Sequence, residues 1–364
     1  MKDDMRLLII SDLHLGRGKF LKNGQTNILE DFVEDDLFVE FVKYYSQGSY
    51  QWESIHLVLN GDILNLIQID IDGVFDHIID AERSARSIEI IQRAHPTFFT
   101  VLKEFLATPN KKLTYVIGNH DAGMAFPLAQ EKFSAIVGGP VDFVFELETC
   151  GVHIEHGHRF EVINTVPPTH YFIDGPHGKK ILNLPWGSLF CINVLPKLRK
   201  ERPYIDKIRP MSSYVSWCFL HDFMFFWKMA YIVIWYFIKS SFENYTKQNR
   251  NFKTTFNVLK QYTMYPKYAQ MAKRILQLAP HLHTVIMGHT HVLEWRRFPE
   301  DKYYFNTGTW NSIPSVDAGL HEHTLKLSYI IVELDTHNEI AQGTSLNEWQ
   351  GNWRPYKSEV NTNG

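Results

Sequence analysis

The sequence predicts an α/β fold that carries its functional groups at the ends of its strands. Short runs of Leu, Ile and Val alternate with longer segments of mixed apolar and charged residues, a pattern typical of strands connected by helices. Several of these runs end on Asp, Asn or His, and ligands of open α/β sheets bind at the carboxyl ends of strands. A proline-rich and then aromatic stretch interrupts the alternation, which predicts one insertion into the α/β body.

The predicted elements follow from the same two patterns, taken in chain order. Continuous apolar runs bounded by turn residues predict strands over residues 6–11, 55–60, 112–117, 141–147, 151–155, 284–287, 303–307 and 325–334. Apolar residues at helical spacing predict helices over residues 27–45 and 81–106.

Composition places the chain among folded globular proteins. Of its 364 residues 45% are apolar and 21% charged, and its formal net charge is -3, which excludes a disordered chain, a collagen and a simple polybasic nucleic-acid binder. The three cysteines are widely spaced, so the sequence predicts neither a disulfide framework nor a cysteine metal cluster. The first residues lack the pattern of a signal peptide. We therefore expect a cytoplasmic protein.

The insertion separates two parts of a catalytic body, so the predicted organisation is 1–163, a helical cap at 164–280, and 281–364. Residues 165–280 contain 17 Lys and Arg but only 5 Asp and Glu, whereas the rest of the chain holds 20 basic and 35 acidic residues. Such asymmetry predicts that something anionic meets the cap. Within the cap, residues 217–242 include 11 aromatic side chains, but the longest uncharged run there, 229–238, is too short to span a membrane.

These cap aromatics have two interpretations. They form the core of a helical cap, or they present an apolar face to lipid at the inner membrane surface. Basic residues on both sides suit an anionic membrane surface or a lipid with a phosphate headgroup: Lys197, Arg199, Lys200, Arg202, Lys207, Arg209, Lys239, Lys247, Arg250 and Lys253. Nucleic acid is a further anionic partner, which ranks lower because the catalytic body is acidic.

Five short motifs bring carboxylate, amide and imidazole groups to the predicted strand ends. They are Asp12-Leu-His14, Asn60-Gly-Asp62, Gly118-Asn-His-Asp121, His156-Gly-His158 and Gly288-His-Thr-His291. Near-extended backbone points side chains at i and i+2 to one side, so we expect Asp12 and His14 to face the same site. Each motif alone has an ordinary structural explanation, such as a turn or a histidine bonded to the backbone. The ordered set of five does not.

Seven residues of these motifs are candidate metal ligands: Asp12, His14, Asp62, Asn119, His156, His289 and His291. Oxygen and nitrogen ligands without a thiolate suit Mn, with Fe or Zn as alternatives. Two carboxylates, one amide and four imidazoles are enough for two divalent cations. A pair of such cations stabilises the attacking and leaving oxygens of an in-line phosphoryl displacement.

With these motifs, the chain resembles the calcineurin-like metallophosphoesterase superfamily over about residues 5–163 and 281–335. The resemblance implies a four-layer α/β/β/α sandwich with a dinuclear metal centre. It assigns Asp12, His14 and His291 to one metal and Asn119, His156 and His289 to the other, with Asp62 as the bridge. It also implies that His120 contacts the phosphate or protonates the leaving oxygen, and that Asp121 orients the His120 ring.

The resemblance therefore implies a phosphoester or pyrophosphate hydrolase that uses a metal-bridging hydroxide. The cap falls where UDP-2,3-diacylglucosamine pyrophosphatase, a relative in the superfamily, has a lipid-accommodating helical insertion, which favours an amphiphilic or apolar-tailed substrate. That relative has arginine where His120 stands. A nuclease or nucleotide phosphodiesterase with the same metal centre is the alternative. We expect His158 to brace the site and Arg17 to be a solvated surface charge.

Overall fold

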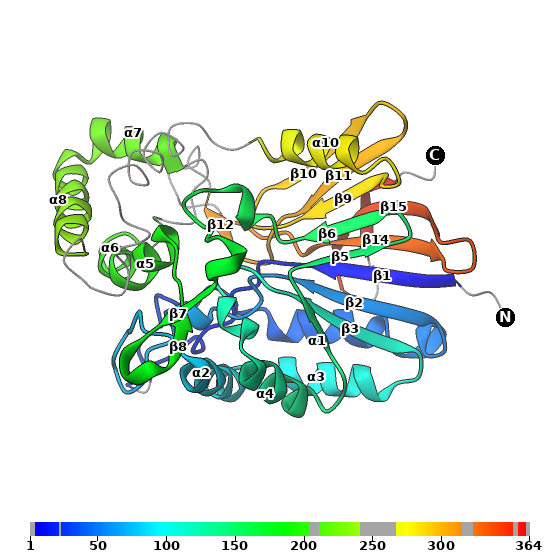
Figure 1. The fold of residues 1–364 in the computed structure, drawn as a ribbon, viewed down its shortest axis with the longest axis horizontal. Helices are drawn as coiled ribbons and strands as arrows, with labels where there is room; N and C mark the ends of the chain where they lie inside the picture. Colours follow the sequence, from blue (N-terminus) through cyan, green and yellow to red (C-terminus); the bar gives the residue numbers. More distant parts are fainter. Residues whose placement is uncertain are drawn as a thin grey trace.

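Two β-sheets lie face to face between two layers of helices in the computed structural model (Figure 1). The model describes residues 4–21, 23–203, 205, 211–240, 267–314, 323–351 and 356–361. The first sheet has the order β16-β15-β14-β1-β2-β3-β4, with β1 at Asp4–Ile10, β2 at Ser54–Asn60, β3 at Lys111–Val116, β4 at Asp142–Val144, β14 at Ser328–Asp335, β15 at Ile340–Trp349 and β16 at Tyr356–Asn361. The predicted four-layer metallophosphoesterase sandwich is thereby confirmed.

The second sheet, ordered β10-β11-β9-β6-β5, closes the sandwich. Its strands are β5 at Glu146–Thr149, β6 at Val152–Glu155, β9 at Thr284–Met287, β10 at Leu293–Phe298 and β11 at Lys302–Thr307. The outer helices over the first sheet are α1 (Asp35–Tyr44), α2 (Ala81–Ala94), α3 (Pro96–Ala107) and α4 (Pro127–Val137). Helix α10 (Tyr268–Leu278) packs on the outer face of the second sheet, although it lies within the range assigned to the cap.

Strand β1 shows why the sheets stack in this way. Successive side chains of a strand point to opposite faces. Leu7 and Ile9 enter the core between the two sheets, whereas Leu8 and Ile10 enter the core under the helices. Because both faces of the strand are covered, its sequence is continuously apolar rather than alternating.

Two predicted elements are each divided in the structure. The helix expected at 81–106 is two helices, α2 and α3, which meet at His95. Pro96 disfavours helical backbone at the residue before it, and His95 accordingly has φ -123° and ψ 56°. The strand expected at 141–147 also divides, because the chain leaves the first sheet after β4 and enters the second at β5. The helix expected at 27–45 begins only at Asp35.

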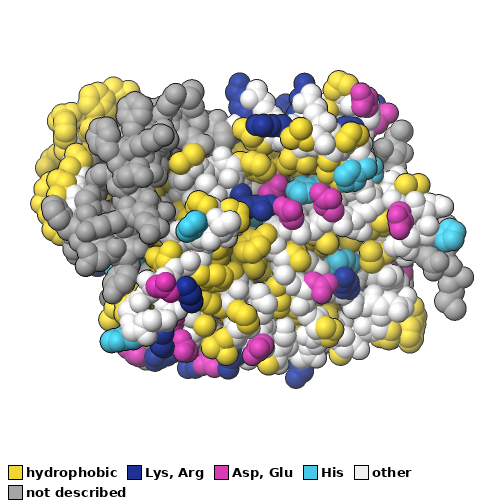
Figure 2. Space-filling model, in the orientation of Figure 1, with side chains coloured by type: hydrophobic (Ala, Val, Ile, Leu, Met, Phe, Trp, Pro, Cys, Tyr) yellow, Lys and Arg dark blue, Asp and Glu magenta, His cyan; other side chains and the backbone are white. Residues whose placement is uncertain are grey.

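Apart from α10, the described part of the cap contributes a two-stranded sheet and four α-helices at the end of the sandwich toward which β1, β2 and β3 run (Figure 1). These are β7 (Phe172–Asp174), β8 (Lys180–Leu182), α5 (Trp186–Asn193), α6 (Leu195–Arg199), α7 (Met211–His221) and α8 (Phe223–Ser240). Hydrophobic side chains gather on the outer side of this end (Figure 2). No helix in the described part of the chain is long and apolar enough to cross a membrane.

Some of the basic residues that flank the cap aromatics do not belong to the described part of the chain. Lys207, Arg209, Lys247, Arg250 and Lys253 lie outside the described residues, as does the side chain of Lys239. The remaining small sheet of the chain pairs β12 (Ile313–Pro314) with β13 (His323–Thr324).

Candidate metal centre

The seven candidate ligands follow the carboxyl ends of five strands. Asp12 and His14 come after β1, Asp62 after β2 and Asn119 after β3. His156 follows β6, and His289 and His291 follow β9. Strands β1, β2 and β3 are parallel, as are β6 and β9, so these residues emerge at the same edge of their sheets.

The backbone at the ligands differs from the expectation for Asp12 and His14. Both residues have positive φ, 55° and 56°, so they do not lie on extended backbone and the predicted reason for their shared direction is wrong. Asp62, His289 and His291 have positive φ as well. Non-glycine residues seldom adopt this region, and such strained positions concentrate at functional sites. Five of the seven ligand positions are therefore held in an unfavourable backbone conformation.

The first group of ligands consists of Asp12, His14 and His291. Nε2 of His14 lies 3.0 Å from Nε2 of His291, which lies 3.3 Å from Oδ1 of Asp12. Atoms bound at about 2.0–2.2 Å to one tetrahedral cation lie roughly 3.3–3.6 Å from one another. The third distance, from Nε2 of His14 to Oδ1 of Asp12, is 3.8 Å, so the three side chains converge to about the spacing of a shared cation. Asp12 is itself fixed by hydrogen bonds, since the backbone N–H of His289 donates to its Oδ2 at 2.9 Å.

The second group consists of Asp62, His156 and His289, whose ligand atoms lie within 4.8 Å of one another. Nε2 of His156 lies 3.2 Å from Oδ2 of Asp62. The same oxygen lies 3.9 Å from Nε2 of His14 in the first group. The Asp62 carboxylate thus stands between the two groups, where the bridge was expected. Nδ1 of His156 donates to the backbone oxygen of Asn60 at 2.9 Å, which leaves its Nε2 lone pair for a cation.

Two observations show that the residues fit a pair of metal ions. Among the described residues, Oδ1 of Asp12, Oδ1 of Asn119 and Nε2 of His156 are buried without a hydrogen-bond partner, an expensive arrangement in the absence of a ligand. Glycines also let the backbone approach the ligands. A Cβ on Gly61 would overlap the His156 ring, and one on Gly118 would overlap Asp62.

His120 reaches the cluster as expected, but Asp121 does not orient it. The His120 ring packs edge-on against His14, with centroids 4.6 Å apart, and its Nδ1 bonds to Oδ1 of Asn65 at 3.0 Å. Asp121 instead accepts hydrogen bonds from the Tyr115 hydroxyl at 2.6 Å and from the backbone N–H groups of Ile63 and Gly118. The predicted partner of the ring is therefore replaced by Asn65, and Asp121 holds together the loops that follow β2 and β3.

Burial and the clustered charges shift the pKa values of these groups in opposite directions. Burial lowers the pKa of His120 to about 3, although Asp62 opposes this, so the ring is neutral. Burial also acts to lower the pKa of His156, but Asp62 and Asp12 outweigh it and raise the pKa to about 10. Burial and the nearby Asp62 raise the pKa of Asp121 to about 7. The raised pKa of His156 reflects the negative charge of Asp62 and Asp12, which also favours a bound cation at this place.

Residues 5–293 match the sequence model of a family described as calcineurin-like phosphoesterase. The match spans most of the chain and includes every ligand position described above. The chain belongs to the calcineurin-like phosphoesterase family. No curated protein matches its sequence significantly.

Solved structures similar to this calcineurin-like phosphoesterase have low identity to it. Vacuolar protein sorting 29 from Cryptosporidium parvum is 11% identical, with 99% of this chain and 97% of that chain covered and a TM-score of 0.34. A dimetal phosphatase from Danio rerio is 9% identical, with 94% and 95% covered and a TM-score of 0.34. The calcineurin-like phosphoesterase YfkN from Bacillus subtilis is 11% identical, with 98% and 89% covered and a TM-score of 0.30.

One acidic residue beside the candidate metal centre of this phosphoesterase, Glu161, was not predicted from the sequence. Its Oε2 lies 2.9 Å from Nε2 of His289 and 2.6 Å from Nδ2 of Asn164. Burial raises the pKa of Glu161, but His289 more than offsets this and lowers it to about 2. The only sequence signal is its place five residues after His156, which does not identify a partner at position 289.

His158 lies beside the candidate ligands, and Arg17 is partly buried in an ion pair rather than a solvated surface charge. The buried His158 ring lies 5.5 Å from the His156 ring and 6.4 Å from that of His289. Arg17 pairs with Asp70, and its Nη1 also donates to the Asp70 carbonyl at 3.1 Å.

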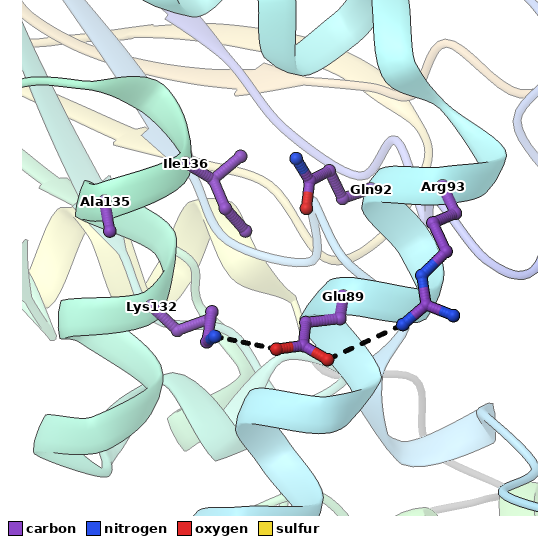
Figure 3. Close-up of a pocket in the computed structure, with 6 residues that line it drawn as sticks. All are labelled: Glu89, Gln92, Arg93, Lys132, Ala135 and Ile136. Atoms are coloured by element: carbon purple, nitrogen blue, oxygen red, sulfur yellow. Dashed lines mark hydrogen bonds and ion pairs between the residues drawn. The ribbon is translucent and has the colours of Figure 1, made fainter.

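A shallow hollow of the phosphoesterase lies between α2 and α4, on the helical face (Figure 3). There Glu89 pairs with Lys132 at 2.7 Å and with Arg93 at 3.6 Å. None of its lining residues is a candidate ligand, and paired surface charges of this kind are ordinary in helical layers. The hollow is separate from the metal centre.

Proposed function

We propose that this protein hydrolyses a phosphoester or pyrophosphate with two divalent cations. Asp12, His14 and His291 hold one cation, while Asn119, His156 and His289 hold the other, with Asp62 between them. The observation that carries this proposal is the placement of Asp62, whose Oδ2 lies 3.2 Å from His156 and 3.9 Å from His14. Two bound cations activate a water nucleophile and stabilise charge on the attacking and leaving oxygens.

His120 acts on the substrate rather than on the cations. Its Nδ1–H donates to Asn65, which leaves Nε2 of the ring for the substrate. The His120 backbone N–H donates to Oδ1 of Asp62 at 2.8 Å, so the ring is tied to the position of the bridge. A neutral ring with its proton on Nδ1 has no proton at Nε2, so His120 must first take up a second proton, which an anionic substrate favours; it then contacts the phosphate or transfers this proton to the leaving oxygen.

The substrate is amphiphilic or carries an apolar tail, because the cap begins beside the ligands. Asn164 lies 3.2 Å from Nε2 of His289, and the preceding Ile163 accepts a hydrogen bond from Gly187 of α5 at 2.8 Å. On the same helix, the half-buried rings of Trp186 and Phe190 stack with centroids 5.3 Å apart. A phosphorylated substrate held by the cations has this aromatic surface of the cap within reach.

The test is hydrolysis by the purified chain supplied with Mn, compared with Zn and Fe. An aryl phosphomonoester, an aryl phosphodiester and a UDP-linked acylated sugar distinguish the substrate classes. We expect hydrolysis together with two bound metal ions per chain, measured by mass spectrometry of the metals. A chain that binds no metal and cleaves none of the three substrates contradicts the proposal. Preference for the aryl diester over the acylated sugar favours the nucleotide phosphodiesterase alternative.

A further inference from the structure

Helix α8 exposes a stripe of large apolar side chains along its outer side. The stripe consists of Met224, Trp227, Tyr231, Ile234, Trp235 and Ile238, and Met224 is 86% exposed. Spacings of three and four residues place these side chains on one face of the helix. Figure 2 shows hydrophobic side chains gathered at the same end of the molecule. Contiguous apolar patches of this kind are uncommon on monomeric proteins and mark interaction sites.

The opposite face of α8 packs on the rest of the cap. The exposed stripe is therefore a second apolar face and not the face through which the helix joins the core. Phe225 and Tyr236 are buried in the main hydrophobic core. The Tyr236 hydroxyl accepts a hydrogen bond from Nδ2 of Asn193, on α5, at 3.2 Å. A helix with one apolar face packed has no internal reason to carry a second one. The second apolar face is exposed in the described part of the chain, so it is available to a partner.

The charges around the α8 stripe are predominantly basic. Lys228 lies within the exposed side of the helix, where it pairs with Glu201. The residue before Glu201, Lys200, is exposed, and so is Lys197 one turn earlier. The two nearby acidic residues form neutral pairs, Glu201 with Lys228 and Asp222 with Arg202, so the excess positive charge comes from Lys197 and Lys200. The whole segment 165–280 has 17 basic against 5 acidic residues, so its partner is anionic.

We propose that the α8 stripe docks on the surface of a membrane that contains anionic lipid. Aromatic side chains such as Trp227, Tyr231 and Trp235 favour the boundary between headgroups and acyl chains. Apolar side chains that enter this boundary, with lysines facing the phosphates, bind a helix parallel to the surface. No helix of the described chain is suited to crossing a membrane, which leaves surface attachment. This inference does not depend on the proposed hydrolysis.

The arrangement favours a lipid surface over a second copy of the chain. In a symmetric dimer the same patch meets itself, so Lys197 and Lys200 of one copy would come close to those of the other. Like charges across an interface weaken association. An anionic lipid surface instead attracts the same lysines, and it has no fixed shape that the stripe must match.

The test compares two triple variants by sedimentation with vesicles of phosphatidylcholine, with and without phosphatidylglycerol. The first removes the stripe with Trp227→Gln, Tyr231→Gln and Ile234→Gln. The matched control changes three similarly exposed apolar residues elsewhere, with Trp52→Gln, Val74→Gln and Ile340→Gln. We expect the first variant to bind anionic vesicles about tenfold or more weakly than wild type, because three large side chains no longer leave water. The control should bind as wild type does.

A second variant keeps the test decisive if the stripe substitutions disturb folding. Lys197→Gln combined with Lys200→Gln leaves the apolar residues in place. It should weaken binding to anionic vesicles by about fivefold per lysine and should not affect binding to phosphatidylcholine alone. Added salt should weaken wild-type binding in the same selective way. Circular dichroism of each variant verifies its fold.

Two results overturn the proposal. One is a failure of the vesicle test: either the wild-type protein stays in the supernatant with anionic vesicles, or the stripe variant binds them as well as wild type does. The other is a lipid-free dimer in analytical ultracentrifugation that the stripe variant dissociates, with no vesicle binding by wild type. A wild-type protein that binds anionic vesicles but hydrolyses none of the three substrates would instead count against the proposed activity alone.

Discussion

The imidazole of His289 donates a hydrogen bond from Nε2 to Oε2 of Glu161 across 2.9 Å. Asn164, the first residue of the expected cap, donates from Nδ2 to the same oxygen at 2.6 Å. One partly buried carboxylate therefore joins a candidate metal ligand to the entry of the cap. Such outer partners fix the orientation and tautomer of a ligating histidine.

Replacing Glu161 should therefore weaken metal binding. Glu161→Gln keeps the size of the side chain but removes its negative charge, so Nε2–H of His289 loses a charged acceptor and keeps at most a weaker hydrogen bond to the amide oxygen. We expect the affinity for Mn to fall by about 10- to 100-fold, with activity restored by excess Mn. Calorimetric titration measures the affinity. Glu131→Gln, at an exposed position of α4, is the matched control, and an unchanged titration for Glu161→Gln would rule out the positioning role.

Removing the bridge should abolish both cation sites together. Asp62→Ala deletes the only carboxylate of the described chain that lies within 4 Å of both His156 and His14. We expect bound Mn and hydrolysis to be lost in parallel, as measured by metal content and aryl phosphate turnover. Asp36→Ala changes an exposed aspartate of α1 and should behave as wild type. An Asp62→Ala protein that retains two metal ions would show that the bridge is elsewhere.

Replacing His120 should lower turnover without removing the bound metal ions. The ring packs against His14 with centroids 4.6 Å apart but bonds to Asn65 rather than to another histidine of the cluster. We expect His120→Ala to keep both metal ions and to lower kcat by about 10²- to 10⁴-fold, the usual range for proton transfer by a positioned side chain. His337→Ala, at an exposed position, is the control. Retained turnover would reject the role of His120.

Much of the fold was predictable because its central strands are buried on both faces. Strands such as β1 and β2 are continuous apolar runs, which the sequence displays directly. In the two large sheets three strands were missed, β10, β15 and β16, and the short strands β7, β8, β12 and β13 outside them were not predicted either. β10 has the sequence LEWRRF and no buried residue, so its charged side chains hide the strand pattern. In β15 polar residues dominate, and only its place beside β14 makes it part of the sheet.

The residues of the candidate site that belong to the five motifs were predictable from the sequence, and those outside the motifs were not. The spacing of the ligand motifs identifies all seven candidate ligands, because each ligand directly follows a strand. Asn65 and Glu161 were missed because their partners, His120 and His289, lie 55 and 128 residues away in the sequence. The positive φ of Asp12 and His14 was also hidden, because it arises from the loop around them and not from a glycine at either position.

A buried histidine away from the metal centre should make stability depend on pH. His95 lies at the junction of α2 and α3, where its Nδ1 is 3.0 Å from Oδ2 of Asp35 and its Nε2 is 3.5 Å from Oε1 of Glu30. Burial acts to lower the pKa of His95, but these two carboxylates outweigh it and raise the pKa to about 9. Glu30 also accepts hydrogen bonds from the backbone N–H groups of Gly16 and Gly18, in the loop that follows His14.

The sign of the effect follows from the raised pKa. Because the folded protein holds the proton more tightly than the unfolded chain, this stabilisation is complete below pH 6.5 and disappears as the pH rises toward 9. The shift from the ordinary value corresponds to a loss of about 2–3 kcal/mol in the free energy of unfolding over that interval. Urea unfolding at several pH values measures it. We expect His95→Gln to be less stable at pH 6 and to show a smaller decline toward pH 9, whereas His337→Gln should follow wild type. Parallel pH profiles for wild type and His95→Gln would contradict the assignment.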